Sequence, residues 1–361
     1  MATFTGQLRS NEIFSALYNM IISQEVFADN LGEHQTLVDK ARVDGGLYGD
    51  TKLYYSTDVL KSVPWGNDAE AANLLALHRP EAPECQAIHL DIFRQICLTV
   101  DNYLSKRAWA TEGAFSSFNS VMLGWMKDTK RVYDGTLYNV FIGTTKAAGA
   151  GQTVSVDLSG ATSLTGVEKE QMEAMLIAQK LADLMVAMGD YSRDFNDYGN
   201  LRSYAKDGIK VVWNSKFVNK IRKIDLPTIF HKDGLIDKFE EDILPERYFG
   251  DVNTSKLTSI EANTVRSTIE KDYTVSGKIT HVFPGDYIPA GATVEIGEGY
   301  KAPTKDVICK VLVKLPPYMS AFEVGTSFFN AKSLTENHYL TFGHNTIEYL
   351  KNYPFITVQV K

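Results

Sequence analysis

The sequence predicts an α+β protein with extended segments outside its packed core. Three observations indicate this class: a long helical apolar repeat over residues 112–142, alternating apolar and polar residues with a polar passage over 41–90, and strand-type composition towards the C-terminus. At 361 residues the chain is long enough for two packed domains. Hydrophobic residues make up 44% and charged residues 22%, which is typical of folded globular proteins.

Charge and cysteine content exclude several classes of protein. The net charge of -7 gives no overall attraction to phosphate backbones, so sequence-specific nucleic-acid binding is not expected, although local contact with DNA is compatible with it. Cys85, Cys97 and Cys309 have no metal-ligand spacing and cannot all pair, which indicates folding in a reducing compartment. No window approaches 18 continuous apolar residues, and residues 1–9 do not resemble a secretion signal, so no membrane association is expected.

The first 90 residues predict two extended elements. Residues 1–40 form an N-terminal arm with a short helix, because apolar residues such as Phe14 and Leu17 recur at helical spacing. Residues 41–90 form a two-stranded ribbon, with one strand in 43–63, a polar tip over 64–83 and a return strand that begins the apolar run 87–100.

A ribbon of two strands buries too little surface to be stable alone in water, so it needs a partner surface, in this chain or in another. The candidate contacts with another subunit are Leu53, Tyr55 and Trp65 on the ribbon, and Phe14 and Leu17 on the arm. Trp65 is the most distinctive of them, because a tryptophan in a polar tip is a typical interface anchor.

The helix over 112–142 contains Phe115, Phe118, Met122 and Trp125 at steps of three and four, and would be roughly 40 Å long. Core packing explains this stripe better than a ligand wall. Residues 144–165 predict a loop or hairpin. Further elements follow it: a helix over 167–188, a short strand over 209–213 and a brief amphipathic helix over 216–224.

The C-terminal half predicts β structure. Closely spaced turn signals over residues 254–303 indicate a β-rich insertion within a domain that covers 166–306. The last part, 307–361, predicts closing strands, of which 307–315 and 355–360 are the clearest.

Residues that could carry chemistry do not form a recognisable site. The seven histidines lack metal-ligand spacing, and no nucleophile elbow, phosphate-binding loop or dinucleotide-binding motif is present. Acidic clusters at 240–242 and at Asp190, Asp194 and Asp197 are better explained as solvated surface than as general acids and bases. We expect no catalytic residue, no cofactor and no metal, and hence no enzyme.

The order of arm, ribbon, long helix, mixed domain and terminal strand resembles the Hong Kong 97-type capsid fold of tailed bacteriophages. The resemblance assigns the N-arm to residues 1–40, the E-loop to 41–90, and the P-domain with its spine helix to 91–165. It assigns the A-domain to 166–306, where VWNSKFVNKIRKIDLP resembles the family's step from a strand to a short helix, and the closing strands of the A- and P-domains to 307–361.

That resemblance implies a major capsid protein that self-assembles into hexamers and pentamers and forms an icosahedral head around double-stranded DNA. The implied partners are other copies of the chain, a separate scaffold protein, the portal, minor or decoration proteins, and the packaged DNA by non-specific contact. The implied location is the virion, after assembly in the host cytoplasm. Some family members crosslink an E-loop lysine to an asparagine; Lys52 and Lys61 with Asn337, Asn345 and Asn352 are available, but crosslinking is not predicted.

Two other functions remain open. An encapsulin-like compartment shell would share the fold and enclose a cargo protein instead of DNA. A carbohydrate-binding or hydrolytic protein is suggested by 18 Tyr and 4 Trp. It would require aromatic residues and paired carboxylates to converge in one cleft.

Overall fold

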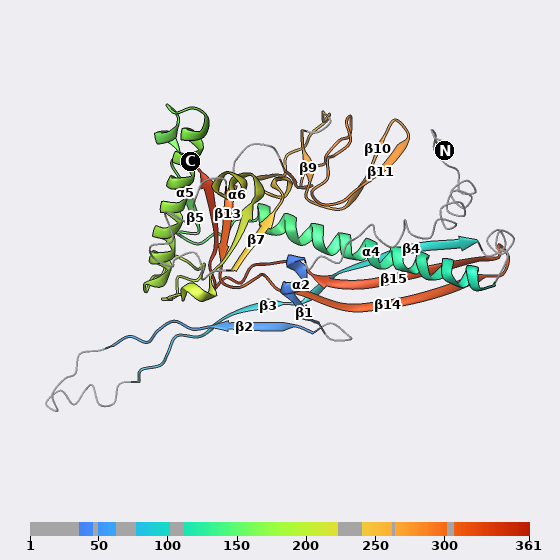
Figure 1. Ribbon diagram of the computed structural model, residues 1–361. Helices are drawn as coiled ribbons and strands as arrows, with labels where there is room; N and C mark the ends of the chain where they lie inside the picture. Colours follow the sequence, from blue (N-terminus) through green and yellow to red (C-terminus); the bar gives the residue numbers. More distant parts are fainter. Residues whose placement is uncertain are drawn as a thin grey trace. The chain divides into compact units, whose positions relative to one another are not determined.

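The computed structural model describes residues 36–45, 50–62, 77–101, 112–222, 240–261, 264–301 and 307–361 (Figure 1). The chain forms two compact units. The first contains Met1–Asp50, Leu90–Gly135 and Met319–Asn345, and the second contains Thr51–His89, Thr136–Tyr318 and Thr346–Lys361. Each unit is therefore assembled from segments that are far apart in the sequence.

The first unit is built on a four-stranded sheet with the order β1–β14–β15–β4. Its strands are β1 (Arg42–Asp44), β14 (Tyr318–Asn330), β15 (Thr335–Asn345) and β4 (Leu90–Asp101), and the short helix α2 (Leu37–Ala41) precedes β1. The strands β4 and β15 are antiparallel along almost their whole length (Figure 1).

The helix α4 (Glu112–Thr144) packs on this sheet through the part that belongs to the first unit. The Tyr133 hydroxyl lies 2.8 Å from Nε2 of the buried His344, whose Nδ1 lies 2.9 Å from the Asn345 carbonyl oxygen. Because burial lowers the pKa of His344, the neutral ring donates from Nδ1 and accepts from Tyr133. The buried carboxylate of Asp134 accepts from Lys130 at 3.1 Å and from Arg42 at 3.4 Å, which ties α4 to the start of β1.

The second unit is built on a five-stranded sheet with the order β5–β16–β13–β6–β7. All residues of the central strand β13 (Val307–Leu312) are buried, and it is antiparallel to β16 (Phe355–Val360) and β6 (Lys210–Asn214). The outer strands β5 (Thr153–Val156) and β7 (Glu240–Leu244) run parallel to their neighbours.

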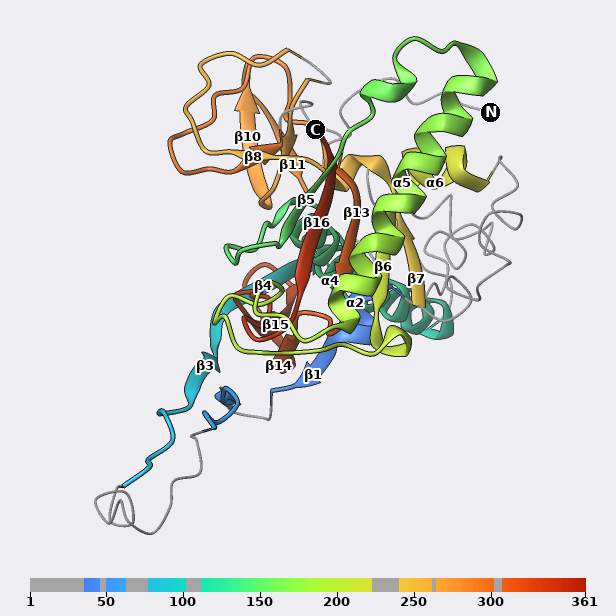
Figure 2. The same cartoon turned by 90° about the vertical axis from the view of Figure 1, so that its left-hand side faces the viewer.

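Two helices, α5 and α6, pack on this sheet through apolar side chains that recur at helical spacing. The helix α5 (Gly166–Gly189) buries Ile177, Leu181, Leu184 and Met188 in the core that includes β6, β13 and β16, and lies beside α6 (Ser215–Arg222) (Figure 2). Short 3-10 helices occur at Ser159–Ala161, Lys206–Gly208 and Glu246–Tyr248.

The β-rich insertion has its own apolar core. It contains the small sheet β8–β12–β9 and the hairpin of β10 and β11, with the bounds Val252–Asn253, Tyr300–Lys301, Arg266–Ser267, Lys271–Val275 and Lys278–Val282 respectively. Its core cluster is made by residues between 257 and 300, with Val294 and Ile288 the most deeply buried. The hairpin turns at Ser276 and Gly277, both with positive φ, which suits a tight two-residue turn.

Several elements differ from the sequence-based expectations. The expected return strand divides at His89: β3 (Glu84–Ile88) pairs with β2 (Lys52–Ser56), whereas β4 joins the four-stranded sheet instead of the ribbon. The alternating pattern of β4 gives the strand one half-buried face. Pairing with β15 covers eleven positions, whereas the ladder of the ribbon covers five. The segment 42–44, expected in the ribbon, pairs with β14 as β1.

Two segments differ from the expectations in how they pair. Residues 144–165, expected to be a loop or hairpin, contain the single strand β5, which pairs with β16. The acidic run 240–242, expected to be solvated surface, lies in β7, beside β6. By contrast, the helices expected over 112–142, 167–188 and 216–224 are found as α4, α5 and α6 within two residues at each end, and the strand expected over 355–360 is β16. The strand expected over 307–315 ends earlier, at Leu312. Apart from α2, the expected arm over 1–40 lies largely outside the described residues.

Candidate assembly interface

The ribbon of β2 and β3 has two chemically different faces. Residues that pair across an antiparallel ladder share a face, so Leu53, Tyr55, Cys85 and Ala87 lie together, and Tyr54, Ser56, Gln86 and Ile88 lie on the other side. The first face is open: Leu53 is 51% exposed and Tyr55 is 65% exposed. Exposed apolar side chains on so thin an element indicate a surface that is covered by something else.

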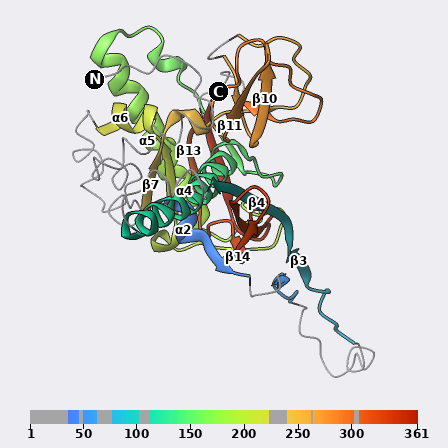
Figure 3. The same cartoon turned by 90° about the vertical axis from the view of Figure 1, so that its right-hand side faces the viewer.

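The apolar surface continues along the described part of the ribbon beyond the paired residues. Val59, Leu60 and Leu77 are all exposed, Leu60 at 78% and Leu77 at 81%. Figure 3 shows β3 running outward from the five-stranded sheet of the same unit. An ion pair between Lys61 and Glu81, 3.2 Å apart, links the two sides of the ribbon, but both side chains are solvated and the pair contributes little.

The inner face of the ribbon is held by Gln86. Its amide nitrogen donates to the Tyr349 carbonyl oxygen at 3.0 Å and lies 3.3 Å from Oε2 of Glu348, while its amide oxygen accepts from the Lys351 backbone N–H at 3.0 Å. A buried amide that uses both of its ends fixes the position of β3 relative to the segment before β16.

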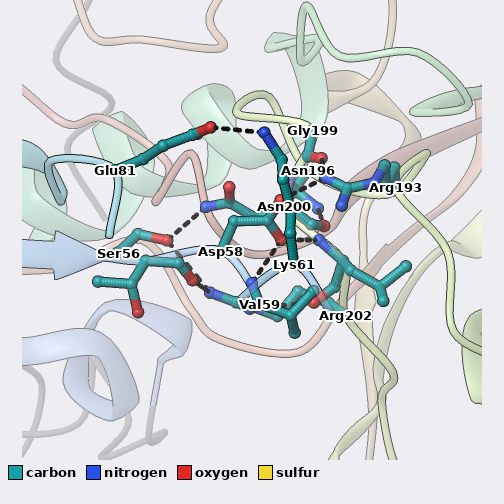
Figure 4. Close-up of polar contacts among 12 residues, drawn as sticks. Ser56, Asp58, Val59, Lys61, Glu81, Arg193, Asn196, Gly199, Asn200 and Arg202 are labelled. Carbon is teal, nitrogen blue, oxygen red and sulfur yellow. Dashed lines mark hydrogen bonds and ion pairs between the residues drawn. The ribbon is translucent and has the colours of Figure 1, made fainter. Parts of the chain in front are cut away.

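The other strand of the ribbon is held by a polar clamp, which we define as Ser56, Asp58, Arg193, Asn200 and Arg202 (Figure 4). Asp58 accepts from Arg193 at 2.6 Å and from the backbone N–H groups of Leu201 at 2.9 Å and Val59 at 2.8 Å. These hydrogen bonds, that from Leu201 first, lower the pKa of Asp58 to about 2, so the carboxylate stays charged throughout the physiological range.

The buried half of the polar clamp is centred on the Ser56 hydroxyl. It accepts from the Asn200 amide at 2.7 Å and from Arg202 at 3.3 Å, and Arg202 also donates to the Thr57 carbonyl oxygen at 2.6 Å. The Asn196 amide donates to the Asn200 carbonyl oxygen at 2.7 Å, and it accepts from the Asn200 backbone N–H at 2.9 Å. These two bonds hold the segment from Asn196 to Asn200 in a closed turn.

Asp197 connects this loop to the core. It accepts from the Tyr349 hydroxyl at 2.5 Å, from the Gln152 amide at 2.7 Å and from the Gly149 N–H at 2.8 Å. Gln152 in turn accepts from the Phe355 N–H at the start of β16. Both strands of the ribbon are thus tied to one polar network around the residues that precede β16.

Of the residues selected from the sequence, Leu53 and Tyr55 lie on the open face of the ribbon, whereas Trp65, Phe14 and Leu17 lie outside the described residues. The expectation that Asp197 belongs to a solvated acidic face was wrong, because it is a hydrogen-bonded connector. The polar clamp was not foreseen. Its only sequence signal is the density of Asp, Asn and Gly in DYSRDFNDYGN, which indicates a loop but not what the loop holds.

The asparagines considered for crosslinking already have partners. Asn345 is buried and accepts from the Met319 N–H at 2.7 Å, and Asn337 accepts from the Thr99 hydroxyl at 2.7 Å. Asn352 lies 3.5 Å from the Asn200 amide. Within the described ranges, no group of three or more His, Cys, Asp or Glu side chains is placed to hold a metal ion. Among the same residues, no helix is both long and apolar enough to cross a membrane.

Comparison with known proteins identifies the fold. No family model and no curated protein matches the sequence. Among solved structures, the chain is similar to one in the capsid structure of Staphylococcus phage Andhra, with a TM-score of 0.54 at 10% identity over 88% of this chain and 81% of that chain. It is also similar to one in the structure of the head fiber and inner core protein gp22 of native bacteriophage P68, with a TM-score of 0.53 at 11% identity over 89% and 83%.

At this identity the similarity establishes the fold alone. The α+β class expected from the sequence is confirmed, and the chain has the Hong Kong 97-type capsid fold.

Proposed function

We propose that this chain is a major capsid protein, a structural subunit that self-assembles into the head of a tailed phage. The observation that carries the proposal is the fold similarity to a phage capsid structure over 88% of the chain. The role is geometric rather than catalytic: many copies with heterologous contacts form hexamers and pentamers that close into an icosahedral shell around double-stranded DNA. The protein then resides in the virion, after assembly in the host cytoplasm.

The ribbon supports this proposal independently of the fold. Its inner face is fixed by Gln86 and the end of β2 by the polar clamp, while Leu53 and Tyr55 are presented to the outside. A surface that is rigidly positioned and apolar is suited to bury area on a neighbouring copy, because little conformational entropy is lost on contact. The ribbon therefore corresponds to the E-loop of the fold.

The finer assignment follows the same fold. We assign the N-arm to residues 1–40, the E-loop to 41–90, the P-domain to 91–165, the A-domain to 166–306 and the closing strands to 307–361. The structure supports a more interleaved division, since segment 42–44 and β4 share the sheet of β14 and β15. A separate scaffold protein, a portal, and minor or decoration proteins complete the proposed set of partners, with Phe14, Leu17 and Trp65 as further contacts between copies.

Electron microscopy and sedimentation of the purified chain, alone and with its scaffold, test the proposal. We expect capsomers or closed shells. The native Cys85, exposed on the ribbon, provides a second measurement in a Cys97→Ser background, which removes the other exposed thiol. Its reaction with a maleimide should slow on assembly, while the buried Cys309 stays unreactive throughout. Only compact monomers under every assembly condition would refute the proposal.

An encapsulin-like compartment shell is the alternative function with the same fold. Analysis of purified shells distinguishes the two, because an encapsulin-like shell would contain a cargo protein and a phage head would contain DNA. The carbohydrate-binding or hydrolytic alternative requires aromatic residues and paired carboxylates in one cleft. A cavity of about 660 Å³ beside the polar clamp is lined by Tyr191 and Tyr204 but by no carboxylate. Two others, of about 530 and 430 Å³, are each lined by two carboxylates but by neither Tyr nor Trp.

A further inference from the structure

The four-stranded sheet of the first unit has a second face, opposite the face on which α4 packs (Figure 1). Tyr133 of α4 contacts Phe342, and the Arg94 guanidinium lies over the Tyr133 ring, so Arg94 and Phe342 point towards the helix. Successive residues of a strand point to opposite faces of a sheet. The residues of β4 that flank Arg94 and continue this alternation point away from α4 and are all exposed: Phe93, Gln95, Cys97 and Thr99.

The middle rows of this second face carry no charged side chain. The registers of β15 and β14 place further neutral residues beside those of β4: Tyr339 and Thr326 beside Cys97, Thr341 and Val324 beside Gln95, and Asn337 and Phe328 beside Thr99. Phe328 is 61% exposed and Phe93 is 60% exposed. A sheet face that meets water is normally polar, whereas the core of a protein interface is depleted of charge. These residues, which we call the open sheet face, therefore have the composition of an interface.

Several polar side chains of the open sheet face are already paired within it. The Gln95 amide nitrogen donates to the Thr341 hydroxyl at 2.9 Å, and the Thr99 hydroxyl donates to the Asn337 amide oxygen at 2.7 Å. The Cys97 sulfur lies 3.6 Å from the Gln95 amide oxygen. Because these contacts persist when the face is covered, its burial carries a small desolvation cost.

The open face of the ribbon has the same neutral composition. Its residues are Leu53, Tyr55, Cys85 and Ala87, and Cys85 is exposed. Each of the two neutral surfaces thus contains one exposed thiol, whereas the third cysteine of the chain, Cys309, is buried. In the heterologous contacts of a closed ring, a surface of one copy meets a different surface of the next copy. The ribbon should therefore meet a surface other than a second ribbon, and the open sheet face matches it in composition.

We propose that Cys85 of one copy and Cys97 of the next copy form a disulfide bond when the assembled shell meets oxidising surroundings. The inference rests on the proposed function, and it adds a covalent modification site to the contact that the ribbon makes. The bond requires the two Cβ atoms to lie about 3.5–4.5 Å apart, so it fixes the ribbon of one copy on the open sheet face of its neighbour. Both thiols stay reduced in the host cytoplasm and are oxidised after the shell is released from it.

The oxidant is a small-molecule disulfide, for which oxidised glutathione is the probe. The thiolate of one cysteine attacks it, forms a mixed disulfide and releases one reduced glutathione. The thiolate of the other cysteine then attacks the protein sulfur of the mixed disulfide and releases the second reduced glutathione. The two protein thiols lose two protons and two electrons, and the two molecules of reduced glutathione carry both away.

The test treats wild-type shells with oxidised glutathione, blocks the remaining thiols with N-ethylmaleimide and separates the chains on a denaturing gel without reductant. Since each copy can be joined to one neighbour through Cys85 and to another through Cys97, we expect a ladder of covalent oligomers that extends beyond dimers. Dithiothreitol should return the ladder to monomers. Mass spectrometry of the digested ladder should identify the peptide that joins Cys85 to Cys97.

Two variants and one control locate the bond. Cys85→Ser and Cys97→Ser should each abolish the ladder while shells still form in electron microscopy, because both positions are exposed and serine is close to cysteine in size. Wild-type subunits that are kept unassembled at low concentration, and treated in the same way, should stay monomeric.

Each other outcome overturns the inference. Dimers without a longer ladder would mean that like thiols pair, and a faster band of monomer mass would mean a bond within one chain. A ladder that persists in either serine variant would assign the cross-link to other groups. Shells that form but stay monomeric on the gel refute the disulfide and leave the proposed function intact. If microscopy and sedimentation find only monomers under every assembly condition, the proposed function fails and the inference fails with it.

Discussion

Arg193 donates a hydrogen bond of 2.6 Å to Asp58 across 135 positions of sequence, and a second one of 2.7 Å to the Gly199 carbonyl oxygen. One guanidinium thus joins the segment that follows β2 to the loop that follows α5. Because its fork is planar and rigid, it fixes a direction as well as a distance. This pair is the polar connection that we expect to set the angle at which the ribbon leaves the second unit.

The polar clamp should be insensitive to mild acid. The pKa of Asp58 is lowered to about 2, so its contribution to stability is present above the ordinary carboxylate pKa and is lost only as pH falls through about 2. Hydrogen exchange of residues 52–56, corrected for the intrinsic rate, should therefore be equally slow at pH 7 and pH 4. In Asp58→Asn it should be faster at both values. Protection that disappears in the wild type between pH 6 and pH 4 would contradict this account.

Removing the buried half of the polar clamp should be costly. Asn200→Ala deletes the donor to Ser56 and leaves a buried hydroxyl with one fewer partner, so the free energy of unfolding should fall by about 1–3 kcal/mol in urea denaturation. Lys61→Ala is the control, because its ion pair with Glu81 is solvated and should change stability by less than about 0.5 kcal/mol. Equal effects of the two substitutions would show that the hydrogen bond from Asn200 to Ser56 adds nothing to stability.

Replacing a glycine of α4 with alanine should have opposite effects on stability at Gly143 and at Gly124. A Cβ atom at Gly143 would lie 2.1 Å from the Tyr248 carbonyl oxygen, which is backbone and cannot turn aside, whereas Gly124 has nothing within 4 Å. Gly143→Ala should lower the free energy of unfolding by about 1–3 kcal/mol through overpacking. Gly124→Ala should raise it by about 1 kcal/mol, since alanine is the better helix former. Thermal unfolding of both variants checks the sign of each change.

The sequence predicted the elements whose signal is local. The helices α4 and α5 carry long apolar periodicity, and β16 is a short apolar run, so their bounds could be read closely. The partner of β4 could not be predicted, because alternation specifies which face is buried but not which strand lies beside it. The acidic strand β7 was missed for a related reason: it is an edge strand on which Glu240 and Glu241 stay exposed, so it pairs with β6 without an apolar pattern that the sequence could show.

The residues of the candidate interface also divide into those that local sequence predicts and those that it does not. Leu53 and Tyr55 could be chosen from the sequence, because exposure of apolar residues follows from a ribbon that has no core. The polar clamp could not, since it depends on a loop that approaches the ribbon from more than 130 residues away. Asp197 shows the limit most clearly: an aspartate in a polar loop has the same local pattern whether it is solvated or joins three segments.

Lys310 predicts an unusual dependence of stability on pH. Its ammonium group lies in the middle of β13, donates to the Thr145 carbonyl oxygen and to the Thr357 hydroxyl, and is fully buried. Burial first, and then the nearby Lys146, lower its pKa to about 7 from 10.5. The cost of burying the charge is present in full below pH 7 and is relieved as pH rises from 7 towards 10.5.

Lys310→Met removes that cost and keeps much of the volume. The variant should therefore be more stable relative to the wild type at pH 6 than at pH 10, with a change on the order of 4 kcal/mol between the two values. Urea denaturation across this range measures the difference. Lys278→Met, at an exposed position, is the control and should show none of this dependence. A constant gap between Lys310→Met and the wild type would mean that the amine is not titrating in the core.

The open face of the ribbon makes the sharpest prediction about assembly. Leu53→Ser with Tyr55→Ser removes two side chains that are more than half exposed, so thermal unfolding of the isolated subunit should change by less than about 0.5 kcal/mol. Assembly should nevertheless be lost or require a much higher protein concentration, because these side chains are proposed to be buried on the neighbouring copy. Ile279→Ser, at an equally exposed position in the β10–β11 hairpin, is the matched control and should assemble normally. If the ribbon variant forms shells at the wild-type concentration, the contact between subunits must be made by another surface.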